Sequence, residues 1–324
     1  MRRRRFMAAA ASVGALATAA SCAGRVATPL PDNEAERAFP PLGRIVEVDG
    51  LPVHVLERGQ GKGPPVILIH GASVNLRDWS FSLMDRLARG GPWGGRRVIA
   101  MDRPGFGYSK RGPGRWSPAR QAAHLRQAAV ALGVEKPIVV GHSWGGAVAV
   151  AWGLDFPQDV TGVVPVSGAT MPWGAGATVF QTLGLGRIGV DYYQANLSRR
   201  AEEGSVESFV ARAFRPQQPP PGYIEYVGAP LSLRAATLEA NAQDLASLHL
   251  GLRDMAPRYP DMRVPVEVVH GELDWLLGVD QHVTEFAASL ADVNTAVAEG
   301  VGHMAHHARP DLLEAAIERL EARG

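Results

Sequence analysis

The chain has very little cysteine, no long apolar run and no excess of charge. Its 324 residues include one cysteine, Cys22, which excludes an intramolecular disulfide and a metal site built from cysteines. The apolar run at residues 8–20 is shorter than the roughly 20 residues of a membrane-spanning helix. The formal net charge of +1 gives no reason to expect a nucleic-acid partner. What remains, 46% hydrophobic and 20% charged residues, is the composition of a globular protein.

The N-terminus has the parts of a secretory signal. Four arginines at residues 2–5 precede the small apolar run, and small residues follow it near a cleavage site. The segment Arg3-Arg4-Arg5-Phe6-Met7 also resembles the twin-arginine export motif, with Met7 where leucine is usual. We therefore expect residues 1–21 to be a signal peptide of an exported bacterial protein.

The single cysteine lies where a lipid anchor would need it. Ala19-Ala20-Ser21-Cys22 resembles a bacterial lipobox, although Ala19 stands where a larger aliphatic residue is usual. We expect Cys22 to be lipidated and the protein to be periplasmic or anchored to a membrane. An ordinary signal peptide that is cut nearby, with Cys22 incidental, is the alternative.

One stretch in the middle of the chain predicts a nucleophile. A short apolar segment at residues 138–140 leads into Gly141-His142-Ser143-Trp144-Gly145, and an apolar, helix-compatible segment follows. Strand, tight turn with a serine, and helix form the nucleophile elbow. Such a sharp turn strains the serine backbone, and Gly141 and Gly145 remove Cβ atoms where the strand and helix approach. In a chain with 37 glycines the bare motif is weak evidence, so the flanking patterns carry the prediction.

The rest of the chain alternates between apolar strands and helices, which predicts a mostly parallel sheet covered on both faces. Asp49-Gly50 between two alternating segments predicts a hairpin, and Pro52 suggests an edge strand. The expected strands are residues 44–48, 51–56, 65–69, 96–101, 138–140, 160–166, 264–269 and 294–298, and the expected helices are 118–132, 281–290 and 310–322.

Residues 171–259 differ from the segments on either side. They contain helical-looking pieces and a proline-rich segment at 216–222, with no buried-strand pattern. We interpret them as a helical cap inserted into the sheet domain. The predicted organisation is a signal peptide at 1–21, a proline-containing tether at 22–42, a core at 43–170 and 260–324, and the cap at 171–259.

A serine hydroxyl needs a base, and in open α/β sheets the partners lie outside the carboxyl ends of the strands. Among ten histidines, His303 follows the predicted strand 294–298. Its orienting carboxylate is expected to be Asp274, after strand 264–269, with Glu272 as the alternative. The weaker candidates for the base are His70, His142, His306 and His307. Asp102 also ends a strand, but the adjacent Arg103 and turn suggest a structural role.

These motifs together resemble the α/β-hydrolase fold superfamily from about Gly43 onward. The matching segments are His70-Gly71, the stretch 102–109, the elbow 141–145, Gly271-Glu-Leu-Asp274 and Gly300-Val-Gly-His303. The resemblance implies an eight-stranded, mostly parallel sheet with helices on both faces and a helical cap. It also implies Ser143 as nucleophile, His303 as base, Asp274 as orienting acid, and an oxyanion hole from the N–H groups of Ala72 and Trp144. No cofactor or metal ion is expected.

The substrate is less defined than the reaction. Related haloalkane dehalogenases and epoxide hydrolases have aspartate at the elbow, whereas this chain has Ser143, and C–C bond hydrolases commonly have asparagine at the position of His142. We therefore expect a carboxylester hydrolase of a small or medium-sized substrate. A lactonase, a C–C bond hydrolase or a perhydrolase is the alternative, and a non-catalytic binding protein on the same fold is a further one. Trp173, Tyr192, Tyr193 and Trp275 are candidates either for a substrate pocket or for core packing.

Overall fold

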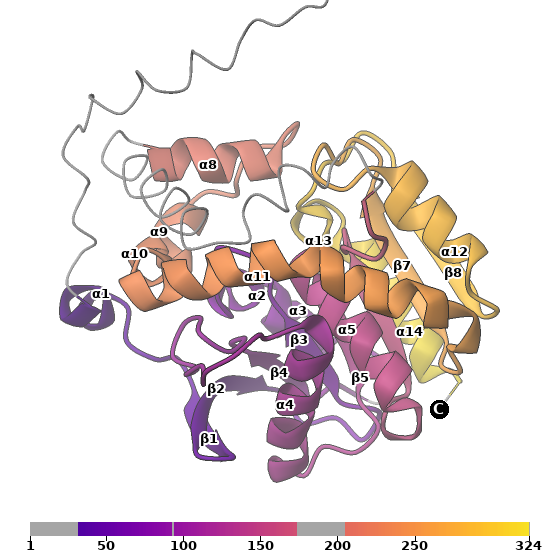
Figure 1. Cartoon of the computed structure of the whole chain (residues 1–324), viewed down its shortest axis with the longest axis horizontal. Coiled ribbons are helices and arrows are strands. Elements are labelled where there is room, and N and C mark those ends of the chain that lie inside the picture. The colour runs from indigo at the N-terminus through magenta and orange to yellow at the C-terminus, as the bar shows by residue number, and fades with distance from the viewer. Residues whose placement is uncertain (1–31, 93, 174–204, 324) are drawn as a thin grey trace, which may run out of the picture.

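A single eight-stranded sheet forms the centre of the structure, a computed structural model that describes residues 32–92, 94–173 and 205–323 (Figure 1). The strand order is β1-β2-β4-β3-β5-β6-β7-β8. β1, β2 and β4 pair antiparallel, and all other neighbours are parallel, so the predicted mostly parallel sheet is confirmed. The strands are β1 (Arg44–Val48), β2 (Leu51–Arg58), β3 (Val66–Ile69), β4 (Val98–Met101), β5 (Ile138–His142), β6 (Gly162–Val166), β7 (Val266–Gly271) and β8 (Val293–Ala298).

The first hairpin follows from its turn residues. Asp49 and Gly50 both have positive φ, at 50° and 74°, which is the geometry of the tight hairpin turn that Asp-Gly favours. The expectation that Pro52 marks an edge strand is wrong, because β2 lies between β1 and β4. Pro52 is tolerated because it pairs only with Glu47 of β1, whereas the pairing with β4 begins at Val55.

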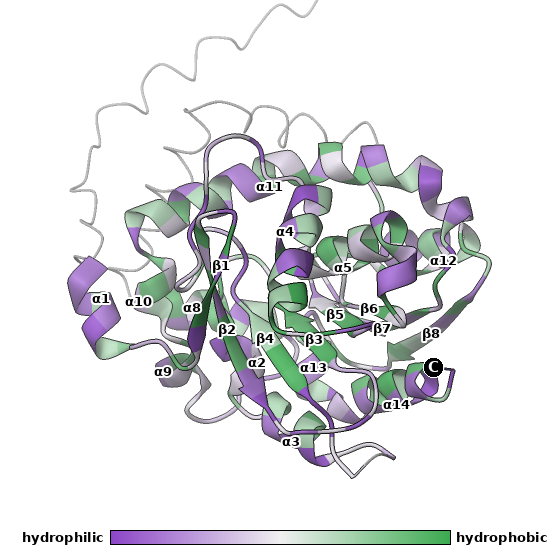
Figure 2. Ribbon diagram, turned by 90° about the horizontal axis from the view of Figure 1, so that it is seen from below, coloured by the Kyte–Doolittle hydropathy of each residue, from purple (hydrophilic) through white to green (hydrophobic). Residues whose placement is uncertain are grey.

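Helices cover both faces of the sheet and create two apolar cores. One core lies between the sheet and α4, α5 and α11, and the other lies between the sheet and α2, α3, α13 and α14. Figure 2 shows the apolar strands enclosed between these helices. The helices of the two faces are α2 (Arg77–Ser80), α3 (Leu83–Arg89), α4 (Pro118–Ala131), α5 (Trp144–Asp155), α11 (Ala235–Met255), α13 (Ala305–Ala308) and α14 (Pro310–Glu321).

The inserted region crosses the sheet on the side of the carboxyl ends of β3 and β5, where Ser73 and Trp144 bond to α11. Over residues 205–259 the structure has helices and no strand, and the long helix α11 runs across the middle of Figure 1, with α8 above it. The further helices of this region are α8 (Ser205–Phe214), α9 (Tyr223–Val227) and α10 (Ala229–Ser232), and the 3-10 turn η3 (Ala256–Asp261) returns the chain to β7.

Two segments differ from the sequence predictions. The tether predicted at residues 22–42 contains helix α1 (Asp32–Ala38), which contacts α10; Ala35 is buried and Arg234 donates to Glu36 at 2.8 Å. A proline-rich pattern did not reveal this contact with the cap. The predicted regular helix 281–290 is a π-helical turn, η4 (Asp280–Glu285), followed by the short α12 (Phe286–Ala288).

Candidate active site

Ser143 lies on the sharp turn between β5 and α5. Its φ and ψ of 52° and −116° are a strained combination for a residue with a side chain. The strain is held by the backbone, because Ser143 N–H donates to Val166 at 3.0 Å and the Ser143 carbonyl accepts from Gly146 and Ala169. A Cβ at Gly141 would lie 2.0 Å from the Gly145 carbonyl oxygen, so only glycine permits this approach.

The structure brings His303 and Asp274 together at the ends of β8 and β7. His303 Nδ1 lies 2.7 Å from Asp274 Oδ2, and the other carboxylate oxygen accepts from the N–H groups of Leu276 and Leu277 at 2.9 and 3.0 Å. Burial by itself would raise the pKa of Asp274, but the hydrogen bond and charge of His303 lower it below its ordinary value. Asp274 is thus an ionised, buried partner that can fix the tautomer and orientation of the His303 ring.

The alternative carboxylate and one further histidine have other roles in this geometry. Glu272 is exposed and accepts from the Gly300 N–H at 2.8 Å. His270, which the sequence patterns did not single out, lies 3.3 Å from Asp274, but its Nε2 donates to the Leu277 carbonyl at 2.7 Å. His303 is therefore the histidine whose Nδ1 is held directly by Asp274.

The proposed oxyanion donors flank Ser143. Trp144 is the first residue of α5, and the N–H groups of a first helical turn have no acceptor within the helix. Ala72 follows Gly71, where a Cβ would lie 3.1 Å from Ser143 Cβ, so the loop after β3 passes directly beside the serine. The N-terminus of α5 also favours developing negative charge through its helix dipole.

Asp102 has a structural role, as its surroundings in the sequence suggested. It accepts from the N–H groups of Leu76 and Tyr108 at 2.8 and 2.9 Å, and from His54 Nδ1 at 2.7 Å. Burial by itself would raise the pKa of Asp102, but His54 and the other donors lower it. The carboxylate therefore ties the loop after β4 to β2 and to the start of α2.

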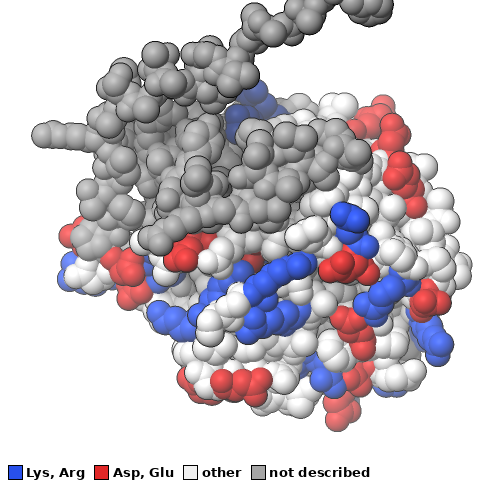
Figure 3. Space-filling model, in the orientation of Figure 1, with Lys and Arg blue, Asp and Glu red and all other residues white. Residues whose placement is uncertain are grey.

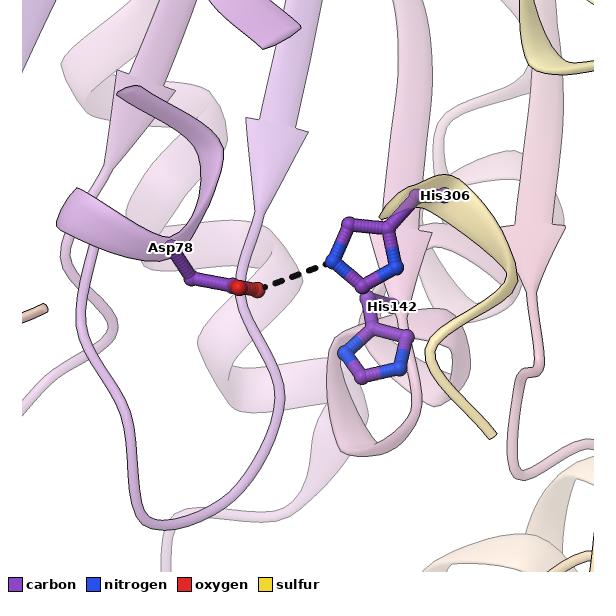
Figure 4. A group of neighbouring side chains, drawn as sticks. All are labelled: Asp78, His142 and His306. Atoms are coloured by element: carbon purple, nitrogen blue, oxygen red, sulfur yellow. Dashed lines mark hydrogen bonds and ion pairs between the residues drawn. The ribbon is translucent and has the colours of Figure 1, made fainter. Parts of the chain in front are cut away.

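Three of the other histidine candidates belong to a buried group that we name the Asp78 cluster: Asp78, His142, His306, His307 and Tyr223. The fourth, His70, lies against the Gly71 carbonyl and the Arg103 N–H. His306 donates to one carboxylate oxygen of Asp78 at 3.1 Å, and His307 and Tyr223 donate to the other at 2.8 and 2.7 Å. The His142 ring packs against those of His303 and His306, with centroid distances of 4.9 and 4.2 Å. Figure 4 shows His142 beside His306 and the bond of His306 to Asp78. His142 also donates to the His303 carbonyl at 3.2 Å.

Three described side chains of this cluster are close enough together to be considered as metal ligands. Potential ligand atoms of Asp78, His142 and His306 lie within 4.8 Å of one another, whereas the ligands of a tetrahedral zinc ion lie about 3.4 Å apart. Both carboxylate oxygens of Asp78 already accept hydrogen bonds from ring N–H or hydroxyl groups. We therefore interpret the Asp78 cluster as a group held by hydrogen bonds and assign no metal ion to it.

The electrostatics of the Asp78 cluster are set by its burial. Burial by itself would raise the pKa of Asp78, but the nearby His306 and His307 lower it well below its ordinary value. Burial and the charge of His307 lower the pKa of His306 to about 4. At neutral pH the group therefore contains an ionised carboxylate that accepts from a neutral His306 ring.

The predicted pocket residues have mixed positions. Trp173 is half-buried and contacts the rings of His249 and His282, with centroids 6.3 and 5.5 Å away. Trp275 is half-exposed and donates to the Arg212 carbonyl of α8 at 3.0 Å. The contacts of Trp173 are ring packing, and the contact of Trp275 is a hydrogen bond to α8. The remaining predicted positions, Tyr192, Tyr193 and Cys22, lie outside the described residues.

The surface adds little to the assignment. On the face seen in Figure 3, acidic and basic side chains are both present, with acidic groups beside the basic ones. Across residues 32–92, 94–173 and 205–323, no helix is both long and apolar enough to span a membrane.

Comparison with known proteins identifies the family. Residues 64–310, more than half of the chain, match the family model of the alpha/beta hydrolase fold. The chain is 33% identical over 126 residues to 2-hydroxy-6-oxo-2,4-heptadienoate hydrolase of Pseudomonas putida. The matched segment covers 38% of this chain and only 43% of that protein. The chain is 26% identical over 271 residues to 2-hydroxy-6-oxo-6-phenylhexa-2,4-dienoate hydrolase of Burkholderia cepacia, which covers 80% and 87%.

Solved structures agree at the level of the fold. An esterase from Exiguobacterium antarcticum superposes with a TM-score of 0.68 at 19% identity, covering 87% of this chain and all (100%) of that one. The elbow, the strand order and the family match lead to one conclusion: the chain belongs to the alpha/beta hydrolase fold family.

Proposed function

We propose that this protein is a serine hydrolase that cleaves a carboxylic ester through an acyl-enzyme. The observation that carries the proposal is the His303–Asp274 pair, 2.7 Å apart, at the same edge of the sheet as the strained Ser143. A strained serine and a histidine with a fixed tautomer at the same edge of the sheet would supply the nucleophile and the base of acyl transfer.

The reaction would use these groups in order. Ser143 Oγ attacks the acyl carbon while His303 Nε2 accepts its proton, and Asp274 stabilises the imidazolium that forms. The N–H groups of Ala72 and Trp144 bind the oxyanion, and a donor of this kind contributes on the order of 10²–10³ in rate. The alcohol leaves with the proton from His303, and a water molecule then repeats the sequence to release the acid.

A second candidate is C–C bond hydrolysis. It is supported by the two relatives named above, whose names describe hydrolases of 2-hydroxy-6-oxo-dienoates. The same serine, base and oxyanion donors could serve that reaction on a ketone. The identity between the chains is 33% or less, so both substrates should be tested side by side.

The first experiment separates these candidates. Wild-type protein and Ser143→Ala are assayed with p-nitrophenyl esters of increasing chain length, with lactones and with a 2-hydroxy-6-oxo-dienoate, and both are treated with a fluorophosphonate probe. We expect turnover of short esters and labelling by the wild type, and loss of both in Ser143→Ala. Retained labelling in the variant would contradict Ser143 as nucleophile. Turnover of the dienoate without ester turnover would favour the second candidate.

We further propose that the mature protein is exported and lipidated at Cys22, which would anchor it to a membrane. The support is the sequence of residues 1–22, with its basic start, apolar run and single cysteine. Mass spectrometry of the mature N-terminus should show a diacylglyceryl-modified Cys22. An unmodified terminus elsewhere would rule this out.

A further inference from the structure

The guanidinium of Arg103 is buried against the loop that precedes Ala72. Its Nε donates to the His70 carbonyl at 3.0 Å and its Nη2 donates to the Gly71 carbonyl at 2.9 Å. Gly71 and Ala72 share one peptide group, so the carbonyl that Arg103 holds lies on the other side of that group from the Ala72 N–H. A cation is thus placed directly behind one proposed oxyanion donor.

His70 adds a second donor to the same carbonyl. Its Nε2 accepts the backbone N–H of Arg103 at 3.0 Å, so in the neutral ring the proton is on Nδ1, which lies 2.8 Å from the Gly71 carbonyl oxygen. Burial and the charge of Arg103 lower the pKa of His70 to about 4, so the ring is neutral at pH 7. The Gly71 carbonyl therefore accepts two hydrogen bonds, one of them charge-assisted.

We propose that Arg103 is a positioning residue that polarises the Gly71–Ala72 peptide group and thereby strengthens the Ala72 N–H as a donor to the oxyanion. The amide bond is delocalised, so a donor on its oxygen makes its N–H more acidic. Hydrogen bonds in such a chain strengthen one another, and the effect is larger in a buried site of low dielectric. This inference rests on the proposed serine-hydrolase function.

The same guanidinium also packs on the side chain of Trp144, whose backbone N–H is the second proposed donor. It lies over the Trp144 ring at 4.5 Å and over the Phe106 ring at 4.2 Å. Its charge is balanced by the buried Asp244 of α11, whose backbone carbonyl accepts from the Trp144 indole at 3.2 Å. One cation therefore contacts the carbonyl of the peptide group that carries one proposed donor and the side chain of the residue that carries the other, and its ion pair with Asp244 connects both to the cap.

The chain offers a matched control in Arg111. Arg111 pairs with the other oxygen of Asp244 at 2.7 Å, and its described hydrogen bonds reach the Pro104 and Ala240 carbonyls and not the loop after β3. Arg111→Met removes a cation from Asp244 and leaves Arg103 in place. A general effect of weakening this ion pair would appear in that variant as well.

Two variants test Arg103 itself. Arg103→Lys keeps the charge, but an ammonium group cannot span two carbonyls and a carboxylate in one plane. The double variant Arg103→Met/Asp244→Asn removes the cation together with its partner, so that no unpaired charge is left buried. Circular dichroism and the melting temperature establish that each variant is folded before kinetics are compared.

The decisive measurement is the carbonyl stretch of the acyl-enzyme. Infrared difference spectra are recorded under single-turnover conditions with p-nitrophenyl benzoate labelled with ¹³C at its carbonyl, alongside kcat and KM for the unlabelled ester. We expect both Arg103 variants to move the acyl carbonyl band to higher frequency and to lower kcat about tenfold with little change in KM, less than the 10²–10³ lost with a whole donor. Arg111→Met should keep the wild-type band and kcat.

Each outcome has one interpretation. A folded Arg103 variant with the wild-type band and kcat would overturn the inference while leaving the proposed function intact. Arg111→Met with the same loss as the Arg103 variants would also overturn it, because the effect would then belong to the ion pair. Absence of both an acyl-enzyme band and ester turnover in the wild type would refute the proposed function, and with it this inference.

Discussion

At the scale of single residues, the two main side chains of the candidate site are held in different ways. Ser143 is held by backbone contacts, and His303 is held by a charged side chain. Ser143 keeps its strained conformation because three backbone hydrogen bonds hold it and the neighbouring glycines allow the close approach of strand and helix. His303 keeps its orientation because an ionised, buried Asp274 accepts its Nδ1 proton at 2.7 Å. The conformation of Ser143 thus rests on several backbone contacts, whereas the orientation of His303 depends on a single carboxylate.

That dependence predicts the effect of removing the charge. In Asp274→Asn the amide can no longer select the His303 tautomer, and we expect kcat for a p-nitrophenyl ester to fall roughly 10³–10⁴-fold. The matched control is Glu272→Gln, because Glu272 lies two positions closer to β7 than Asp274 and its described hydrogen bond is to the Gly300 N–H. It should keep kcat within about twofold of the wild type. A larger loss in Glu272→Gln than in Asp274→Asn would reverse the assignment of the orienting acid.

At the scale of elements, the Asp78 cluster joins three segments that are distant in sequence. Asp78 belongs to α2, Tyr223 to α9 in the cap, and His306 to α13, which begins two residues after His303. One buried carboxylate therefore connects the cap to the segment that carries the proposed base. Phe81 and Phe214 pack against the Tyr223 ring of this cluster, and Phe214 also packs against His307.

Two tyrosines on α9 allow this connection to be measured. Tyr223→Phe removes the hydroxyl that donates to ionised Asp78, so the free energy of unfolding should fall by about 2 kcal/mol. Tyr226→Phe removes a hydroxyl of the same helix that bonds to Ser80 in a partly exposed position, and should cost less than about 1 kcal/mol. Urea unfolding of both variants measures the difference. An equal or larger loss in Tyr226→Phe would show that Asp78 is not the stronger anchor of α9.

The parts of the site that could be predicted are those with a local cause. The elbow is visible because strand, glycine and serine adjoin one another, and Asp274 and His303 because each follows a strand that the sequence pattern predicts. Asp78 and Arg103 could not be found in this way, because their partners are set by tertiary packing: Asp78 and His306 lie 228 positions apart, and Arg103 and Asp244 lie 141 apart. The sequence contains one indirect indication: a buried charge needs a partner, and the residues near Asp78 and Arg103 in the sequence do not provide one.

At the scale of the whole molecule, the structure buries several histidines in their neutral form. The pKa values of His70, His282 and His306 are each lowered to about 4, mainly by burial. In the unfolded chain these rings titrate near 6.5, at about the ordinary value of histidine. Between pH 6.5 and pH 4 the unfolded state therefore binds more protons than the folded state, and acid favours unfolding.

The expected consequence is a loss of stability at mildly acidic pH. The stabilising contribution is complete above about pH 6.5 and falls by about 1.4 kcal/mol per pH unit for each such histidine as the pH drops towards 4. Asp78 and Asp274 have lowered pKa values, so their contributions are lost only at still lower pH and do not mask the effect. Urea unfolding at pH 7.5, 6.5, 5.5 and 4.5 should show this decline.

One substitution tests the origin of that decline. His282 accepts the N–H groups of Thr170 and Met171 through Nδ1, at 3.2 and 3.3 Å, and an asparagine carbonyl oxygen can accept in its place. In His282→Asn one buried ring with a lowered pKa is gone, so the slope of unfolding free energy against pH between 6.5 and 4.5 should become shallower by about 1.4 kcal/mol per pH unit. An unchanged slope in this variant, or a stability that does not vary between pH 7.5 and pH 5, would show that the buried histidines do not govern the acid sensitivity of the fold.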